Sequence, residues 1–372
     1  MTLFLISFII VYGSMQAAVY FRVLPLMPSS YIFRLVVALW FVFMVAAPIL
    51  THLLDHALLS FPAKLMAWIG YTWMGVSFIA FCLTLAIYIS QVLFNLTARL
   101  FSWNSLRISP LNQAWLIVVL TLVLSIWAVY GHQSLKMQRL NLVSSKLKAS
   151  NEQLRIVFIS DLHLGLMAGK KSAQEVVSKI KSENADIVLC AGDLLDSNLA
   201  GLKEIAYTFK SLTPKYGKYA VTGNHETYIG NKKAVTLLSH AGFTVLRNKS
   251  IDLNKSINLL GIDYGHNDKC QLEEKLTDNL NPNQFNILLK HAPIACKRNS
   301  KFIDLQLSGH THKGQIFPFS LAAKVVYPYL AGLYELENGK NLYVSQGTGS
   351  WGPRMRLGTN REITIISLTG KD

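Results

Sequence analysis

Apolar residues dominate the first third of the chain and form four long stretches. An α-helix needs roughly 18 apolar residues to cross a bilayer, and each stretch is close to or above that length. Tyrosine and tryptophan lie near several of the ends, where they act as interfacial anchors in membrane proteins. The first stretch lacks the basic start of a signal peptide, so we expect it to be retained. We predict a transmembrane region over residues 1–132 with about four helices, at residues 3–21, 35–54, 66–94 and 114–130.

The pattern changes after residue 132, where short apolar runs typical of buried strands alternate with amphipathic runs typical of helices. A first strand or a plain tether is expected at 137–143. Further strands are predicted at 154–160, 187–191, 219–222, 243–247, 257–262, 285–289, 305–308, 342–345 and 362–367, and helices at 172–182, 200–212, 232–241 and 271–279. This alternation predicts one layered α/β domain over residues 133–372, with helices covering the sheet and the site at strand ends. The strand-rich tail predicts a second sheet packed on the first.

Charge is unevenly distributed between these two regions. The chain has 36 basic and 21 acidic residues, and all but five basic residues and one acidic residue lie after residue 132. A basic domain held at a bilayer suits anionic lipid surfaces or phosphorylated substrates; good solubility is the alternative reason for such a charge. No basic stripe interleaved with aromatic residues is present, so we predict no nucleic-acid partner.

The orientation of the predicted spans follows from the charges of their connecting loops. The loops near residues 22–34 and 95–113 carry four arginines and no acidic residue, which places them in the cytoplasm and both termini outside. Lysine and arginine directly after the last span, including Lys136 and Arg139, argue for the opposite orientation. We predict a multi-pass protein of the cell membrane with an extracytoplasmic soluble domain.

The four cysteines do not predict a disulfide framework. Cys82 lies in an apolar span and Cys190 in a predicted buried strand. Cys270 and Cys296 are the only plausible pair, and the sequence alone leaves both their pairing and the redox compartment open.

Three polar residues end the second predicted span. His52, Asp55 and His56 would share one helix face, and ionisable groups within membranes are often functional. At the end of a span, however, polar residues also simply meet headgroups and water, and we favour that interpretation.

A carboxylate and an imidazole, Asp161 and His163, close the predicted strand at 154–160. Side chains two residues apart on a strand point the same way, so this pair can share one metal ion. Four further clusters also follow short apolar runs, so all five are expected at strand ends and together predict one site. They are Gly192-Asp193, Gly223-Asn224-His225-Glu226, Lys290-His291 and Gly309-His310-Thr311-His312.

These clusters offer oxygen and nitrogen donors without cysteine, from Asp161, His163, Asp193, Asn224, His291, His310 and His312. Such a donor set suits Mn²⁺, Fe, Zn²⁺ or Mg²⁺. It exceeds what one ion takes, whereas a shared carboxylate can hold two ions about 3.5–4 Å apart, the geometry for in-line attack of an activated water on phosphorus. His225 can then assist the leaving group. We therefore predict a centre with two divalent metal ions.

The same motifs, in this order, resemble those of the calcineurin-like metallophosphoesterase family, over roughly residue 136 to the C-terminus. The segment Ser345-Gln-Gly-Thr-Gly-Ser-Trp-Gly-Pro-Arg-Met-Arg-Leu-Gly358 resembles the membrane-linked and exported bacterial branch of that family. The preceding spans resemble those of a vertebrate-type transmembrane phosphoesterase. The resemblance implies a four-layer αββα sandwich, here preceded by a four-helix transmembrane region.

The resemblance also implies a role for each residue of the site. One metal ion would be held by Asp161, His163 and His312. The other would be held by Asn224, His291 and His310. Asp193 would bridge the two ions and His225 would assist the leaving group. Glu226 departs from the aspartate that many relatives carry, and we expect little consequence.

Three further residues are weaker candidates. Arg354 and Arg356 could grip the substrate phosphate, with solvated loop charges as the alternative. Asp196 is expected to cap a helix or to support a neighbouring ligand.

These observations predict a membrane-bound phosphoesterase that hydrolyses phosphoric mono- or diesters or pyrophosphate bonds. A lipid-linked phosphoester is the attractive substrate, because the anchor keeps the site near a bilayer. One alternative is the pyrophosphatase activity on UDP-diacylglucosamine that some family relatives have in lipid A synthesis, which requires a cytoplasmic site. Another is a membrane sensor that binds a phosphorylated ligand without turnover.

Overall fold

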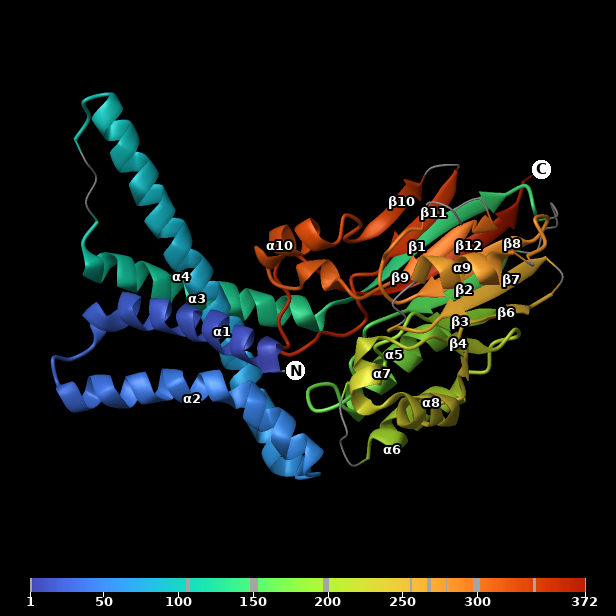
Figure 1. The fold of residues 1–372 in the computed structure, drawn as a ribbon, viewed down its shortest axis with the longest axis horizontal. Coiled ribbons are helices and arrows are strands. Elements are labelled where there is room, and N and C mark those ends of the chain that lie inside the picture. The colour runs from blue at the N-terminus through green and yellow to red at the C-terminus, as the bar shows by residue number, and fades with distance from the viewer. Residues whose placement is uncertain are drawn as a thin grey trace. The chain divides into compact units, whose positions relative to one another are not determined.

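The computed structural model describes residues 2–104, 108–147, 153–196, 201–254, 256–265, 269–278, 280–296, 302–336 and 339–371 (Figure 1). The chain forms two compact units. One contains Met1–Tyr130 and Gly352–Met355, and the other contains Gly131–Trp351 and Arg356–Asp372. The predicted boundary at residue 132 stays a prediction.

The first unit is helical. Among the described residues, four helices are long and apolar enough to cross a membrane. They are α1 (Thr2–Val23), α2 (Tyr31–His56), α3 (Ser60–Leu100) and α4 (Pro110–Gln133), with a short 3-10 turn η1 (Leu24–Leu26) after α1. Large side chains such as Trp68 and Trp127 face outward, as expected for helices surrounded by lipid.

Small and polar residues bring these helices together. A Cβ atom at Gly70 of α3 would lie 2.8 Å from Cβ of Ala47 on α2, so the two backbones approach closely. Gln16 of α1 donates to Ser77 Oγ (3.0 Å) and accepts from Trp73 Nε1 (3.1 Å) on α3.

The second unit contains two six-stranded sheets. The first sheet has the order β1 (Leu135–Ser144), β12 (Arg361–Gly370), β2 (Leu154–Ile159), β3 (Ile187–Cys190), β4 (Lys218–Ala220) and β5 (Thr244–Val245). Strands β2 to β5 are parallel, β12 is antiparallel to β2, and β1 runs parallel to β12. The expected first strand is therefore confirmed, and it pairs with the last strand of the chain.

The second sheet has the order β10 (Gly332–Leu336), β11 (Lys340–Val344), β9 (Leu305–Ser308), β8 (Phe285–Lys290), β7 (Ile257–Ile262) and β6 (Lys249–Asp252). Its four inner strands are parallel, and the two edge strands β10 and β6 are antiparallel to their neighbours.

Strand β2 shows why the sheets stack in layers. Ile156 and Phe158 point into the apolar core between the two sheets, where Phe158 meets the ring of Tyr343 edge-on at 6.2 Å. Val157 and Ile159 point the other way, into a core shared with helices. Both faces of β2 are therefore buried over residues 156–159, which explains the apolar run there. Replacing Phe158 by alanine would cost about 3–5 kcal/mol of folding stability.

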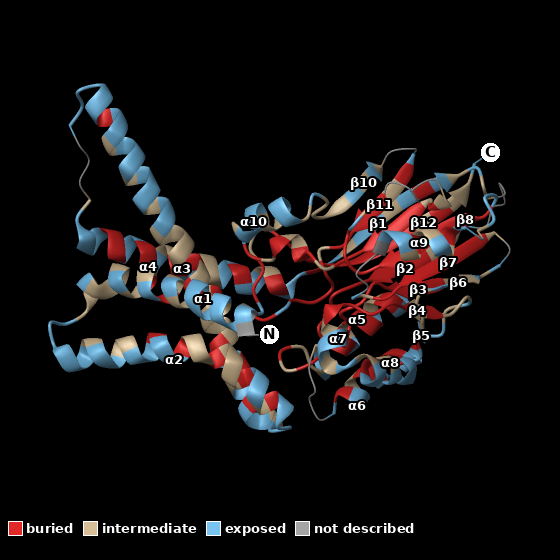
Figure 2. Ribbon diagram, in the orientation of Figure 1, coloured by how far each residue is buried: buried red, intermediate tan, exposed pale blue. Residues whose placement is uncertain are grey.

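Helices cover the outer faces of both sheets. The first sheet is covered by α5 (Lys170–Ser182), α6 (Leu202–Tyr207) with the 3-10 turn η2 (Thr208–Ser211), and α8 (Asn231–His240). On the second sheet, Leu260 and Leu288 pack against Leu272 of α9 (Lys269–Thr277). The layers are helix, sheet, sheet and helix, with the buried residues concentrated in the sheets (Figure 2). The predicted αββα sandwich is confirmed.

Among the described residues, two strands and two α-helices were not predicted: β6, β10, α7 (Asn224–Ile229) and α10 (Phe319–Val326). The two strands lie at sheet edges and have no fully buried residue, so they lack the apolar run of an inner strand. Helix α7 has only six residues. Residues 200 and 279, at the ends of two predicted helices, lie outside the described part of the chain.

Candidate metal centre

The predicted ligands lie where parallel strands of the two sheets end. Asp161 and Asp193 follow β2 and β3 closely, and Asn224 begins α7 after β4. His291 directly follows β8, while His310 and the 3-10 turn η4 (His312–Gly314) follow β9. Parallel strands present their carboxyl ends at one edge of a sheet, so residues far apart in sequence meet there.

Unusual backbone conformations are concentrated at this edge. Asp161, His163, Asp193, His310 and His312 all have positive φ angles, between 47° and 73°. Residues other than glycine rarely adopt this left-handed region, and such strain typically marks functional sites.

Two glycines make room for the carboxylates. A Cβ atom at Gly309 would lie 2.1 Å from Asp161 Oδ2, and one at Gly223 would lie 2.0 Å from Asp193 Oδ1. No larger residue fits at either position unless a carboxylate moves. The glycines in the Gly-His and Gly-Asn motifs are therefore required by close packing.

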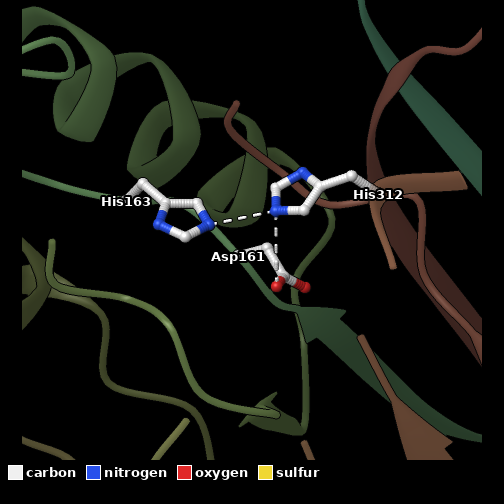
Figure 3. A group of neighbouring side chains, drawn as sticks. All are labelled: Asp161, His163 and His312. Carbon is white, nitrogen blue, oxygen red and sulfur yellow. Dashed lines mark hydrogen bonds and ion pairs between the residues drawn. The ribbon is translucent and has the colours of Figure 1, made fainter. Parts of the chain in front are cut away.

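Asp161, His163 and His312 form a first group of possible ligands (Figure 3). Nε2 of His312 lies 3.0 Å from Nε2 of His163 and 3.6 Å from Asp161 Oδ1. All three side chains are buried or nearly so. Two ring nitrogens at this distance repel each other unless a proton or a metal ion lies between them, so the group suits a cation.

Asp193, Asn224, His291 and His310 form a second group. Nδ1 of His291 donates to the carbonyl oxygen of Ala191 (2.7 Å), so Nε2 is the ring nitrogen that faces the other donor atoms. That nitrogen lies 3.2 Å from Asp193 Oδ2, 3.1 Å from Asn224 Oδ1 and 3.1 Å from His310 Nδ1. Electron-rich atoms converge at one point, so a divalent cation fits here too.

Asp193 lies between the two groups, because its Oδ2 atom is also 4.0 Å from Nε2 of His163. Burial alone would raise the pKa of Asp193, but the nearby rings of His291, His225 and His163 outweigh it and hold this pKa well below the usual range. The carboxylate is therefore ionised, as a shared ligand must be. At Asp161, by contrast, burial prevails over the neighbouring His291 and raises the pKa.

His225 is paired with a second carboxylate. Its Nδ1 atom lies 2.5 Å from Asp196 Oδ1, and its backbone N–H donates to Asp193 Oδ1 (2.9 Å). Burial would lower the pKa of His225, but the Asp196 charge and hydrogen bond outweigh burial and raise it to about 9. Asp196 also approaches Nδ1 of His163 at 3.5 Å. Asp196 thus contacts Nδ1 of both histidines and helps to orient their rings.

Glu226 has a larger role than the sequence indicated. Its buried carboxylate accepts N–H bonds from Asp193 (2.8 Å), Gly223 (2.7 Å) and Leu195 (3.0 Å). It therefore fixes the loop that presents Asp193. The change from aspartate to glutamate at this position was expected to matter little, because only ligands were considered.

Arg356 is buried and fully hydrogen-bonded within the protein, which argues against its predicted role as a phosphate-binding residue. Its side chain is 1% exposed, and its five N–H donors are matched by five protein acceptors. These acceptors are Ser350 Oγ, His312 Nδ1 and the carbonyl oxygens of Gln346, Asn360 and Gly349. Arg354 belongs to the other compact unit, and its phosphate-binding role stays a prediction.

A two-sheet sandwich with histidine, carboxylate and amide donors at its strand ends defines the class of metal-dependent phosphoesterases. Residues 154–314 match the family model described as calcineurin-like phosphoesterase. The chain belongs to the metallophosphoesterase family, as its motifs predicted.

Relatives of known sequence agree with this assignment. An uncharacterized metallophosphoesterase of Aquifex aeolicus is 32% identical, over 64% of this chain and 93% of its own length. One of Helicobacter pylori is 32% identical over 80% of each chain. A Bos taurus transmembrane protein with metallophosphoesterase domain is 29% identical over 95% of this chain and 89% of its own. Together with the four apolar helices, this similarity indicates a membrane protein.

Proposed function

We propose that this protein is a membrane-bound hydrolase that cleaves phosphoric ester or pyrophosphate bonds with the help of two divalent metal ions. The position of the ionised Asp193 between two groups of inward-facing donor atoms carries the proposal. The first ion would be held by Asp161, His163 and His312. The second would be held by Asn224, His291 and His310. Mn²⁺, Fe, Zn²⁺ or Mg²⁺ suits these donors.

Bound in these groups, two divalent cations would supply an activated water and offset the charge of the phosphoryl oxygens. The protein contributes the proton for the leaving group. Asp196 holds Nδ1 of His225 and stabilises the protonated ring, whose pKa of about 9 keeps the proton in place at neutral pH. His225 can then protonate the departing oxygen as a general acid.

The residues near His225 favour a lipid-linked substrate. The rings of Tyr228 and Trp351 lie 5.3 and 6.2 Å from the His225 ring, and the two residues are 66% and 49% exposed. Exposed aromatic side chains suit an amphipathic ligand or a membrane interface better than open water. A lipid carrying a phosphoester headgroup would meet both the aromatic rings and the metal centre.

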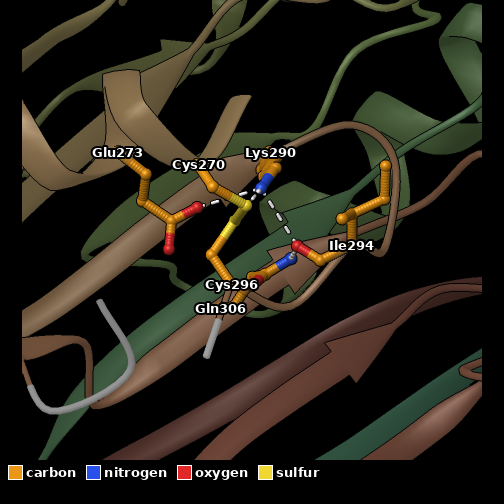
Figure 4. The surroundings of a disulfide bond; sticks show 6 residues. All are labelled: Cys270, Glu273, Lys290, Ile294, Cys296 and Gln306. Atoms are coloured by element: carbon orange, nitrogen blue, oxygen red, sulfur yellow. Dashed lines mark hydrogen bonds and ion pairs between the residues drawn. A yellow bond between two sulfur atoms is a disulfide. The ribbon is translucent and has the colours of Figure 1, made fainter. Parts of the chain in front are cut away.

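A disulfide supports an extracytoplasmic domain. Cys270 of α9 is bonded to Cys296, which follows His291 by five residues (Figure 4). Nζ of Lys290, next to His291, binds Glu273 Oε2 (2.9 Å) beside this bond. Disulfides persist mainly in oxidising compartments. The alternative activity on UDP-diacylglucosamine needs a cytoplasmic site, so this pairing counts against it.

Hydrolysis of bis-p-nitrophenyl phosphate by the full chain in detergent, with Mn²⁺ added, tests the activity. We expect turnover by the wild type and none by Asp193→Asn. Metal binding without turnover of any phosphoester tested would instead favour the alternative function, a membrane sensor that binds a phosphorylated ligand without hydrolysing it. A panel of lipid phosphates and nucleotide-linked lipids then identifies the substrate class.

A further inference from the structure

Helix α10 presents apolar side chains to its surroundings instead of to the domain core. None of its residues is buried, and it is pale blue along much of its length in Figure 2. Among its large apolar side chains, Val325 (86%), Val326 (68%) and Leu321 (63%) are the most exposed. Phe317, just before the helix, is 54% exposed. Soluble surfaces rarely keep so many large apolar side chains together without a partner.

The apolar residues share one face of the helix. Leu321 and Val325 are four residues apart and lie along one ridge of the helix. Ala322 and Val326 lie in the same way along the neighbouring ridge. The opposite side of the helix packs on the domain, because a Cβ atom at Gly314 would lie only 2.4 Å from the backbone nitrogen of Ser320. The apolar face is therefore turned away from the protein core and has no cover among the described residues.

We propose that this face of α10 lies in the interfacial layer of the membrane that holds the protein. The domain cannot leave this membrane, because β1 begins at Leu135, two residues after the last residue of α4. Such a short tether keeps the local concentration of lipid very high. Lys324, exposed on α10 itself, adds attraction to anionic headgroups. Apolar residues on one side with lysine at the margin are typical of helices that lie in a membrane surface.

Helix α10 is directly connected to the metal centre. Tyr327 follows its last residue, and Tyr327 Oη lies 2.8 Å from Nε2 of the candidate ligand His310. A membrane-seated α10 would therefore hold the centre close to lipid headgroups. This last consequence rests on the proposed phosphoesterase function, whereas the membrane contact of α10 does not.

Spin-label accessibility on the full chain tests the contact directly. The label is attached at Val325→Cys in a Cys82→Ser background, where the remaining free thiol, Cys190, is buried. The protein is placed in vesicles of equal parts phosphatidylcholine and phosphatidylglycerol. Ser239→Cys, exposed on the polar helix α8, is the matched control, and Leu321→Cys is a second label on the proposed face.

We expect labels at 325 and 321 to be accessible to oxygen and protected from an aqueous nickel reagent, and the label at 239 to show the reverse. Aqueous accessibility at 325 and 321 would overturn the proposal. Spin-spin broadening at 325 that disappears on dilution with unlabelled protein would show a second copy as the occupant. Low accessibility of the labels at 325 and 321 to both oxygen and the nickel reagent would show that another protein covers this face. Either result also overturns the proposal.

A second arm separates this proposal from the lipid-linked substrate. Leu321→Gln combined with Val325→Gln should reduce hydrolysis of phosphatidic acid in vesicles by roughly fivefold or more, because both side chains lose their apolar burial. Hydrolysis of bis-p-nitrophenyl phosphate should stay unchanged. If the wild type hydrolyses no lipid phosphate, the lipid-linked substrate fails, and the spin labels still decide the position of α10.

Discussion

Nη2 of Arg356 lies 3.1 Å from Nδ1 of His312, on the side of the ring opposite the nitrogen that faces Asp161 and His163. The guanidinium is held by four other acceptors and cannot turn away. One of them, Ser350 Oγ, also contacts Nδ1 of His132 at 3.0 Å. Arg356 is thus a positioning residue that fixes the plane of one candidate ligand, a task that partners behind metal ligands commonly have.

Arg356→Lys should weaken binding of the first metal ion by about 10–100-fold, the usual cost of losing such a partner. Lysine keeps the charge but not the fork of donors, so the His312 ring loses its fixed orientation. Mn²⁺ titration calorimetry on the detergent-solubilised chain measures the effect. Arg139→Lys, at an exposed ion pair with Glu183, is the control. Unchanged affinity in both variants would show that Arg356 only stabilises the loop.

His225→Gln should lower kcat by about 10²–10⁴-fold for alkyl phosphoesters, because the proton for the leaving oxygen is lost. The loss should be much smaller for p-nitrophenyl esters, whose leaving group needs no proton. Asp196→Asn should show the same dependence on the leaving group, since this carboxylate holds the His225 ring. His240→Gln, exposed at the end of α8, is the control. Equal losses for both ester types would exclude His225 as the general acid.

Glu226→Gln should lower both stability and metal affinity. One carboxylate oxygen becomes an NH₂ group that faces backbone N–H donors in a buried loop, which costs about 1–3 kcal/mol for each acceptor lost. The loop that carries Asp193 should then shift. Thermal unfolding and Mn²⁺ titration measure the two effects, with the exposed Glu204→Gln as control. A variant with wild-type values in both assays would contradict the role assigned to Glu226.

Removing the disulfide should destabilise the second unit. The bond joins positions 26 residues apart, for which chain entropy predicts about 3.5 kcal/mol of stabilisation. Cys270→Ser with Cys296→Ser should therefore lower the unfolding temperature.

The state of these cysteines in intact cells tests the extracytoplasmic position of the domain. Both cysteines of the wild type should resist alkylation until they are reduced, and a reporter fused after Asp372 should be active outside the cytoplasm. Free thiols in cells and a cytoplasmic reporter would place the domain inside.

The candidate ligands could be located from the sequence because each of them follows a short strand that its apolar run predicts. Asp161 and His163 after the run at 154–160 are the clearest case. Short apolar runs also predicted the inner strands, since burial on both faces keeps most of their residues apolar, with few exceptions such as Asn286 and Gln306. The same reasoning could not find the roles that the structure gives Arg356 and Glu226, because their partners are backbone atoms and a ring brought together only by folding.

Helix α10 was missed for a related reason. Its sequence, Phe-Ser-Leu-Ala-Ala-Lys-Val-Val, has only eight residues, too few for a helical period to stand out, and it is too short for a span. The edge strands β6 and β10 were not predicted because neither has a buried residue, so neither has the apolar run of an inner strand. The sequence of an exposed element is set by the solvent or lipid around it, whereas hydrophobic periodicity reflects only packing within the chain.

Anomalous diffraction from crystals of the Mn²⁺-loaded protein tests the central claim most directly. We predict two peaks about 3.5–4 Å apart, with Asp193 touching both. One peak should contact Asp161, His163 and His312, and the other Asn224, His291 and His310. A single peak, or none within reach of Asp193, would contradict a dinuclear centre.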